Sequence, residues 1–591
     1  MNIEPKFLLT FIMATLVGCA ADQEVKPKQS NANLPAHSVQ TKALEESVAA
    51  DQIEAPLVRQ QAAPESPVRT AKPTLDGQHK SAKRAHELAA FQAPAMAHSF
   101  AAPIGQAQDH PGYYSVETDR EQYATITPGA IKLVSSEPVS TFSIDVDTGS
   151  YSNIRRLLNH GALPPKDAVR IEEMINYFDY AYSTPETQDQ PFSIQTELAV
   201  SPWSKDHALL RIGLKGYEPQ SEKRPASNLV FLLDVSGSMN SPDKLPLLKK
   251  SLLLLSQQLS EQDSVAIVVY AGASGVVLEP TAGNQSLKIE QALESLSAGG
   301  STNGQAGIEQ AYQLARQAYK PEGINRVILA TDGDFNVGTS NVEDLKTLIA
   351  QKREQGISLT TLGFGGGNYN DHLIEQLADV GNGNYAYIDG FNEARKVLVE
   401  QLSATLMTIA KDVKIQVEFN PAVVKEYRLL GYENRALARE DFNNDRVDAG
   451  EIGAGHHVTA LYELVLQGSD GQRIDPLRYQ HESSSDAKTS QHIVNELAFI
   501  KLRYKAPNAT QSTLISRPVL MPDQLMAFEQ ASEDFRFSAT VAGFGEHLRQ
   551  SHYVSGLDYE QLIAHALQAK GADPFGYRSE FIQLLRLAAR L

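Results

Sequence analysis

A chain of 591 residues is too long for a single hydrophobic core, and its length predicts several domains. Acidic residues outnumber basic ones, 71 to 53, which gives a net charge of −18. A surface of this sign repels nucleic-acid phosphates and anionic membrane faces, so we expect no nucleic-acid partner. The single cysteine, Cys19, excludes an intramolecular disulfide.

The first residues have the pattern of a signal peptide. Lys6 supplies a positive charge, and the apolar run after it is too short to span a bilayer as an ordinary helix. The segment LVGC, ending at Cys19, resembles the lipobox of bacterial lipoproteins, where the peptide is cut before the cysteine and the thiol is acylated. That resemblance predicts a signal peptide over residues 1–18 and a lipid-anchored protein of the cell envelope, periplasmic or surface-exposed. Ala20, in place of Asp, favours the outer membrane. An ordinary secretory signal with a chance cysteine is the alternative.

The next stretch, residues 19–112, is rich in Ala, Gln, Pro, Ser and Lys and nearly free of aromatic side chains. Such a composition buries too little apolar surface to offset chain entropy, so we expect a disordered tether. A flexible chain of this length has a root-mean-square reach of roughly 50 Å.

Ordered structure is expected from Tyr113 onward. Residues 113–217 are predicted to form a small α+β domain, because a helical pattern precedes the extended runs FSIQTELAVSPW and HALLRIGLKGY. The apolar face of that helix consists of Ile171, Met174, Ile175 and Phe178. A polar linker, residues 218–227, follows.

Between residues 228 and 407, apolar strand-like runs alternate with amphipathic helical patterns. The strand-like runs are NLVFLLDVS, DSVAIVVYAG, NRVILATDGD, ISLTTLGFG and the short NYAYID. Continuous apolar strands between helices are typical of a parallel sheet covered on both faces. We therefore expect a doubly wound, mostly parallel α/β domain with a Rossmann-like arrangement.

After Lys411 the pattern changes to antiparallel strands separated by turns. The runs are DVKIQVEFNP, VVKEYRLLGYEN, HHVTALYELVLQG and ELAFIKLRYKAP. Three helical patterns then close the chain. Residues 411–591 are therefore predicted to form a β-sandwich-like and helical domain.

Five polar side chains are candidates for one site. In a doubly wound sheet, ligands bind outside the carboxyl ends of the strands. Asp234, Ser236 and Ser238 follow the first strand at alternate positions. Thr302 stands in the glycine-rich loop AGGSTNG, and Asp332 ends a later buried strand. We expect these residues to meet at one edge of the sheet; the alternative is a pair of capping serines and two turn aspartates.

This D-x-S-x-S pattern, with the later Thr and the T-D-G segment, resembles the metal-ion-dependent adhesion site (MIDAS) of von Willebrand factor type A (VWA) domains. The resemblance covers residues 228–407, and all five positions are filled. The wider layout is similar to that of the bacterial YfbK-like lipoproteins, through TFSIDVDTGSYSNIRR before the domain and AREDFNNDRVDAGEIGAGHHVTALYE after it. Family resemblance here implies an architecture more than an activity.

The resemblance implies a Mg²⁺ site, also suited to Mn²⁺ or Ca²⁺. Ser236, Ser238 and Thr302 would bind the ion directly, and Asp234 and Asp332 would act mainly through water. Mg²⁺ prefers near-octahedral oxygen ligands and keeps some waters. Neutral hydroxyl ligands leave the ion electron-poor, so an open position accepts a carboxylate from a protein partner's Asp or Glu. The alternative function is an envelope scaffold or assembly factor whose structural metal takes one of the chain's own carboxylates.

Other motifs carry weaker predictions. GFGGGN, residues 363–368, is expected to form a tight turn at the sheet edge, since its last residue replaces the third glycine of a dinucleotide loop. Residues 441–451 resemble a calcium loop, but Arg446 replaces the required glycine, which leaves a hairpin loop as the alternative. Asp145 and Asp147 are expected at a strand end before a helix N-cap.

Enzyme signatures are missing from the sequence. We find no H-E-x-x-H, G-x-S-x-G or G-x-x-x-x-G-K-[ST] motif, and no carboxylates paired for acid–base work. His456 and His457 alternate along a strand without partners at metal-ligand spacing, so we expect structural roles for them. The sequence predicts a binding protein and not an enzyme.

Overall fold

The computed structural model describes residues 120–187, 189–218, 224–272, 274–300, 304–333, 341–475 and 495–591. All of them belong to one compact unit, Asp109–Leu591. The predicted signal peptide, the predicted lipidation site Cys19, the predicted tether and Thr302 lie outside the described residues. Among the described helices, none combines the length and the apolar composition that crossing a bilayer requires.

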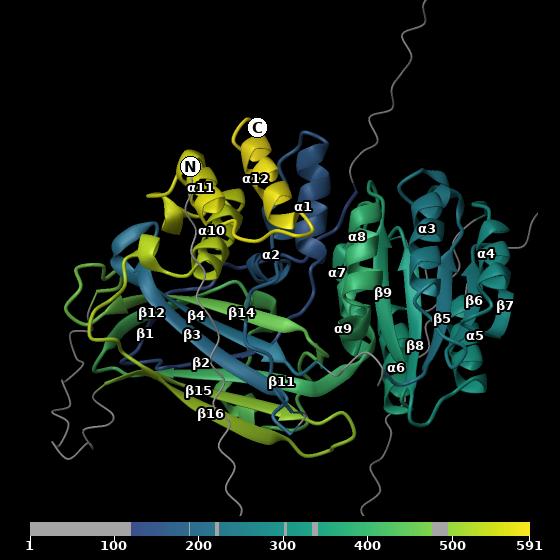
Figure 1. Ribbon diagram of the computed structural model, residues 1–591, viewed down its shortest axis with the longest axis horizontal. Helices are drawn as coiled ribbons and strands as arrows, with labels where there is room; N and C mark the ends of the chain where they lie inside the picture. The colour runs from purple at the N-terminus through teal and green to yellow at the C-terminus, as the bar shows by residue number, and fades with distance from the viewer. Residues whose placement is uncertain are drawn as a thin grey trace, which may run out of the picture. The chain divides into compact units, whose positions relative to one another are not determined.

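A six-stranded sheet forms the centre of the α/β part (Figure 1). Its strand order is β10 (Tyr385–Ile388), β9 (Ser358–Phe364), β8 (Ile324–Thr331), β5 (Ser227–Asp234), β6 (Ser264–Tyr270) and β7 (Ser274–Ala282). Neighbours pair in parallel except β6 and β7, which are antiparallel. The predicted doubly wound, mostly parallel fold is confirmed, and β7 is an edge strand that the sequence pattern did not indicate.

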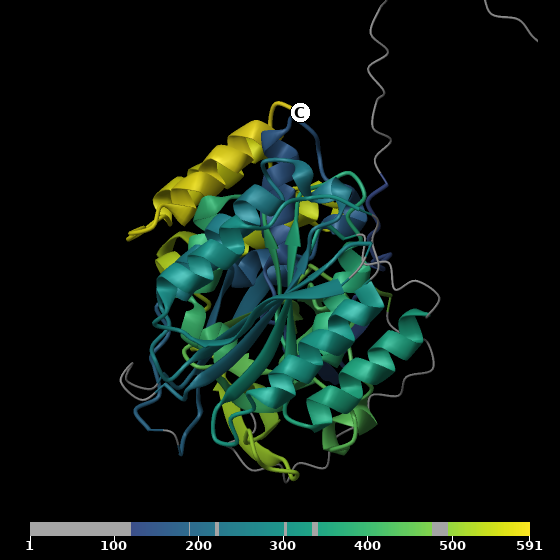
Figure 2. The ribbon, with the colours of Figure 1, turned by 90° about the vertical axis from the view of Figure 1, so that its right-hand side faces the viewer.

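Helices cover both faces of this sheet, as the view in Figure 2 shows. One face packs against α3 (Leu245–Ser256), α4 (Ser286–Glu294) and α8 (Phe391–Arg395). The other packs against α5 (Gly304–Gln317), α6 (Val342–Glu354) and α7 (Asp371–Val380). All eight residues of β5 are buried, which explains the continuous apolar run LVFLL at its centre. A π-helical turn, η4 (Lys396–Glu400), and α9 (Leu402–Leu406) lead out of the domain.

The remaining strands build two sheets packed over a shared apolar core, which we call the sandwich body. The first sheet has the order β1 (Lys132–Leu133), β12 (Val424–Leu430), β14 (His457–Leu466), β4 (Ser204–Gly216) and β3 (Phe192–Ser201). The second contains β13 (Ile452–Gly453), β11 (Thr408–Phe419), β15 (Glu496–Lys505) and β16 (Thr513–Leu520), with β2 (Val139–Ser143) paired to β11.

Strands from the N-terminal and the C-terminal parts of the described chain therefore share each sheet. Antiparallel pairing joins β4 to β14 and β2 to β11. The segments that we expected as an N-terminal and a C-terminal domain thus fold together into one body. The periodicity of the sequence does not reveal this arrangement, because the alternation of apolar and polar residues in a strand is the same whichever strand pairs with it.

A helical layer lies on the outer face of the first sheet. It consists of α1 (Gly149–Asn159), α2 (Ile171–Asn176), α10 (Glu533–Leu548), α11 (Tyr559–Gln568) and α12 (Tyr577–Ala588). The predicted stripe of Ile171, Met174, Ile175 and Phe178 is buried in its core. Short 3₁₀ turns η1 (Lys166–Ala168), η7 (Phe528–Gln530) and η8 (His552–Val554) adjoin these helices, and η5 (Glu433–Arg435) and η6 (Arg439–Asn443) lie between β12 and β13.

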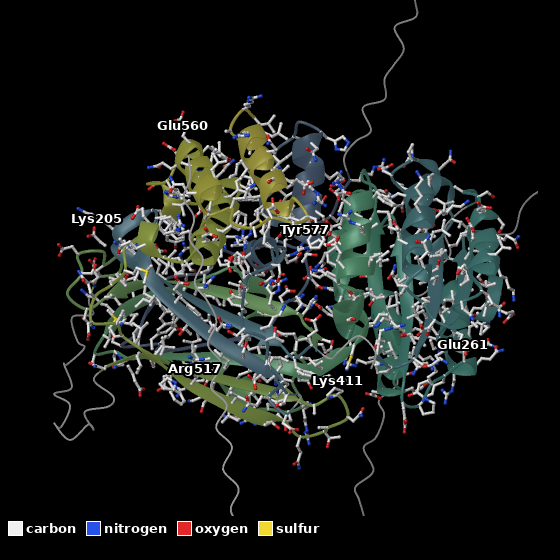
Figure 3. All side chains as sticks on the ribbon, in the orientation of Figure 1. Lys205, Glu261, Lys411, Arg517, Glu560 and Tyr577 are labelled. Atoms are coloured by element: carbon white, nitrogen blue, oxygen red, sulfur yellow. The ribbon has the colours of Figure 1, made fainter. Side chains whose placement is uncertain are left out.

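Buried arginine–carboxylate pairs join the helical layer to the α/β part. Arg155 of α1 contacts Glu393 of α8 at 2.6 Å, and Arg170 contacts Asp371 of α7 at 2.5 Å. Tyr577 of α12, labelled in Figure 3, donates a hydrogen bond to Glu400 at 2.7 Å. Breaking a buried ion pair leaves an uncompensated charge, which is costly. The two arginine–carboxylate pairs therefore hold the α/β part against the helical layer.

Candidate functional site

The candidate site lies where β5 and β8 end. Leu233 and Ala330 are paired in parallel register, so Asp234 and Asp332 emerge at the same edge of the sheet. Both carboxylates are fully buried, with 0% of each residue exposed. We call this edge, with Asp234, Ser236, Ser238 and Asp332, the carboxyl edge.

Asp234 is held by neutral donors. Its Oδ1 accepts a hydrogen bond from the backbone N–H of Ser236 at 2.9 Å. Its Oδ2 accepts from the hydroxyls of Tyr270 and Thr331, each at 3.2 Å. Burial raises the pKa of Asp234 to about 6, and the nearby Asp332 adds to the increase, against the lowering effect of the Ser236 hydrogen bonds.

The two serines lie together on η3 (Gly237–Asn240) and the residue before it, with their Oγ atoms 2.9 Å apart. The glycine-rich loop reaches the same place, because the N–H of Gly237 donates to the carbonyl of Gly300 at 3.1 Å. Gly300 has φ +89°, a conformation that favours glycine. Four of the five predicted residues are thus described at one edge, and the fifth, Thr302, falls outside the described part of its loop.

Lys244 is a member of the site that the sequence motif did not include. It immediately precedes α3, is 7% exposed, and its Nζ donates to Oδ2 of Asp332 at 2.9 Å. The aliphatic stem of this lysine passes over Gly365, where a Cβ would lie 2.3 Å from the lysine Cε. Gly365, in the predicted GFGGGN turn, therefore leaves room for the lysine.

The side chains at the carboxyl edge suit a hard divalent cation. All four described motif residues offer oxygen, two as carboxylates and two as hydroxyls, and oxygen is what Mg²⁺ prefers. The ammonium group of Lys244 beside Asp332 shows that the edge favours positive charge. No three His, Cys, Asp or Glu side chains converge as a metal site in the described ranges, so a metal at this edge depends on the hydroxyl groups.

The other acidic motif, Asp145 and Asp147, has a structural role. Asp145 Oδ1 accepts from the N–H of Asp147 at 2.9 Å, and Asp147 Oδ1 accepts from the N–H of Tyr385 at 2.8 Å. The expected N-cap is not made by a side chain, since Thr148 precedes α1 without a capping hydrogen bond. Burial raises the pKa of Asp147 well above its usual range, with Asp145 contributing.

The calcium-loop resemblance does not correspond to a calcium site among the described residues. Asn443 accepts a hydrogen bond from Arg503 at 2.9 Å, and Asp445 accepts from the Ser512 hydroxyl at 2.5 Å. Glu451 instead lines a cavity of about 210 Å³ together with Asp145. The predicted ligands therefore face different groups.

The two adjacent histidines are structural, as expected. A ring nitrogen of His457, Nε2, lies 2.7 Å from the carbonyl oxygen of Phe178. Burial lowers the pKa of His457 to about 4 and that of His456 to about 3, so both rings are neutral at physiological pH.

Comparison with known proteins agrees with this architecture. The family model described as von Willebrand factor type A domain matches residues 228–401, and the model described as von Willebrand factor matches residues 117–211. The model described as uncharacterized protein YfbK, C-terminal, matches residues 404–591.

Two curated relatives and a solved structure extend the comparison. The uncharacterized protein YfbK of Escherichia coli is 48% identical over 473 residues, covering 79% of this chain and 81% of that protein. The uncharacterized protein sll0103 of Synechocystis is 24% identical over 336 residues, covering 56% of this chain and 74% of that protein. A von Willebrand factor type A structure from Catenulispora acidiphila is 15% identical with a TM-score of 0.37, covering 69% of this chain and 91% of that one.

Proposed function

The chain belongs to the YfbK family of proteins with a VWA domain, and from that premise we propose that it binds a protein partner through a divalent cation at the carboxyl edge. VWA domains commonly mediate protein–protein interactions. The proposed function uses that general property and assigns it to a Mg²⁺-dependent site.

The observation that carries the proposal is the pair of buried carboxylates at one sheet edge. Asp234 and Asp332 are each 0% exposed and lie at the same sheet edge, where Lys244 pairs with Asp332. Buried carboxylates are costly unless they are paired, or coordinate a metal. The adjacent Ser236 and Ser238 hydroxyls add two neutral ligands of the kind that Mg²⁺ accepts.

Residue roles follow from this arrangement. Ser236, Ser238 and Thr302 would hold the ion directly, while Asp234 and Asp332 would act mainly through water. The bound cation would supply an electrophilic position for a carboxylate oxygen of a partner's Asp or Glu. Asp234 would also hold the loop in place, because its Oδ1 accepts from the Ser236 N–H at 2.9 Å. This chemistry is binding without bond-making, so we propose no enzymatic activity.

A second candidate is an envelope scaffold whose metal is permanently liganded by the chain itself. One observation favours it: residues 120–122 pair with the loop that follows Gly365. The N–H of Arg120 donates to the carbonyl of Gly367, and the N–H of Gln122 donates to the carbonyl of Tyr369, both at 2.8 Å. The chain's own N-terminal part therefore reaches a loop that contacts Lys244.

The proposed setting is the cell envelope, with Cys19 as the lipid anchor and residues 19–112 as the tether. Crosslinking in intact cells, with and without a membrane-permeant chelator, tests the proposal. We expect a captured partner that disappears with chelator and with Asp234→Ala, and that survives the exposed control Asp243→Ala. Capture that is indifferent to chelator and to Asp234→Ala would favour the scaffold instead.

A further inference from the structure

We propose that Lys244 is a resident cation of the carboxyl edge that opposes divalent-ion binding and favours an anionic partner once the ion is bound. This inference rests on the proposed function and assigns a specificity-determining residue to it. Lys244 would neutralise Asp332 in the metal-free protein. It would also leave the loaded site with a net positive charge, which a partner carboxylate then neutralises.

The position of the ammonium group is fixed by its surroundings. The backbone N–H of Lys244 donates to the carbonyl of Ser241 at 3.1 Å, and its carbonyl accepts from the N–H of Leu248 at 2.8 Å. The side chain is 9% exposed and ends 2.9 Å from Asp332, which is fully buried. The lysine is therefore built into the site and is not a surface side chain that happens to fold back.

Gly365 and its neighbours maintain this arrangement. A Cβ at position 365 would lie within 3 Å of three carbon atoms of the lysine stem, so this position of the turn requires glycine. The carbonyl of Gly365 accepts a hydrogen bond from the hydroxyl of Tyr387, a fully buried residue. The loop that confines the lysine is thus itself anchored to β10.

Formal charges give the direction of the effect. Asp234, Asp332 and Lys244 together carry one net negative charge. A divalent cation changes this to one net positive charge, and a partner's carboxylate then brings the site to neutrality. Without the lysine, the loaded site would be neutral and the partner's carboxylate would leave it negative. Because buried charges are weakly screened, the lysine should lower divalent affinity and raise carboxylate affinity.

The first experiment compares divalent affinity in the full chain. Isothermal titration calorimetry with MnCl₂ is carried out on the wild type, Lys244→Met and Lys250→Met. Lys250 is an exposed lysine of the same helix, so its variant makes the same charge change away from the site. We expect Lys244→Met to bind Mn²⁺ more tightly, on the order of tenfold, and Lys250→Met to match the wild type. Equal or weaker binding by Lys244→Met overturns the inference.

A second measurement guards against a variant that folds poorly. Lys244→Gln keeps a hydrogen-bond donor near Asp332 but carries no charge. In EDTA this variant should melt below the wild type, because the buried Asp332 then loses the ammonium group that donates to it. Adding Mn²⁺ should raise its Tm by more than it raises that of the wild type. A Mn²⁺-induced rise no larger than the wild-type rise contradicts the proposal.

The third measurement tests the partner side with acetate as the probe. Acetate is titrated into the Mn²⁺-loaded proteins while water proton relaxation reports displacement of water from the ion. Acetate should bind Lys244→Met more weakly than the wild type, on the order of tenfold. Equal or tighter acetate binding by the variant contradicts the partner half of the inference.

The outcomes separate this inference from the proposed function. If Mn²⁺ binds the wild type, is lost in Asp234→Ala, and binds Lys244→Met no better, only the role of Lys244 is overturned. If neither the wild type nor Lys244→Met binds Mn²⁺, the proposed function and the inference fail together. If Lys244→Met alone binds Mn²⁺, the lysine excludes the ion, which supports its opposition to metal binding but overturns the proposed function and the partner half of the inference.

Discussion

Two regions of the α/β part bury carboxylates in opposite ways. In the first region, Asp371 of α7 and Glu393 of α8 each meet an arginine of the helical layer at 2.5–2.6 Å. At the carboxyl edge, Asp234 accepts hydrogen bonds from neutral donors and Asp332 accepts one from Lys244. Guanidinium groups give paired, rigid contacts suited to structure. The carboxyl edge instead brings two buried carboxylates together with two hydroxyls, and these are oxygen ligands of the kind that a divalent cation prefers.

The largest expected effect lies in the arginine-anchored region. Arg170→Met keeps most of the side-chain volume but removes the guanidinium group that pairs with the buried carboxylates of Glu173 and Asp371. We expect a loss of about 3–5 kcal/mol of unfolding free energy. Urea denaturation measures it, and a loss under about 1 kcal/mol would show that these pairs do not anchor the two parts.

The sandwich body has a comparable buried carboxylate, Glu463, which extends the comparison to pH. It accepts hydrogen bonds from Trp203 and Arg428 and lies 2.7 Å from His207, and its surroundings hold its pKa at about 2. Although burial alone would raise that pKa, the His207 contact, the arginines and the Trp203 hydrogen bond lower it.

Because the folded pKa lies below the unfolded value, Glu463 stabilises the fold above the unfolded pKa of about 4.5 and loses that effect as pH falls toward 2. Glu463→Gln should therefore cost about 3 kcal/mol at pH 7 and little near pH 2. Denaturation curves at several pH values measure the difference. A cost that does not change with pH would contradict the electrostatic account.

Replacing a buried aspartate by asparagine should change the stability of the protein in opposite directions in the two regions. Asp371→Asn removes one carboxylate partner of the buried Arg170 and should destabilise the protein. Asp234→Asn removes a buried carboxylate held by neutral donors, and at pH 8 in EDTA should stabilise it by about 1–2 kcal/mol. Thermal melts of both variants provide the test, and a destabilising Asp234→Asn would mean that the carboxyl edge is structural like the other region.

The smallest effect is expected for an exposed pair that also joins the two parts. Arg353 contacts Asp448 at 2.5 Å, but the aspartate side chain is 54% exposed. Arg353→Met should cost less than about 1 kcal/mol, because water and salt screen the pair. A loss as large as that of Arg170→Met would show that burial is not what distinguishes these contacts.

Sequence reasoning identified the parallel sheet and its edge because both depend on local patterns. Apolar runs predict buried strands, and the carboxyl ends of parallel strands lie together, so Asp234 and Asp332 could be placed at one edge from the sequence. No local pattern in the sequence indicates which distant strand will pair with a given strand. The sharing of sheets by β4 with β14 and β2 with β11 therefore appeared only in the structure.

Lys244 and the anchoring arginines were missed for a related reason. A lysine before a helix is usually solvated, and nothing local indicates that its stem will cross a glycine and reach a buried aspartate. Arg170 likewise pairs with Asp371, about two hundred residues away in the chain. The one available signal was the glycine cluster around Gly365, since a turn of glycines often marks a close approach of another group.

Divalent-ion affinity of the carboxyl edge is the most direct test of the central claim. Calorimetric titration of the full chain with MnCl₂ should give one site in the wild type and in the exposed control Asp243→Ala. Asp234→Ala should lose about a hundredfold or more in affinity while keeping its far-UV circular dichroism. Wild-type affinity in Asp234→Ala, or no Mn²⁺ binding by the wild type, would contradict the account.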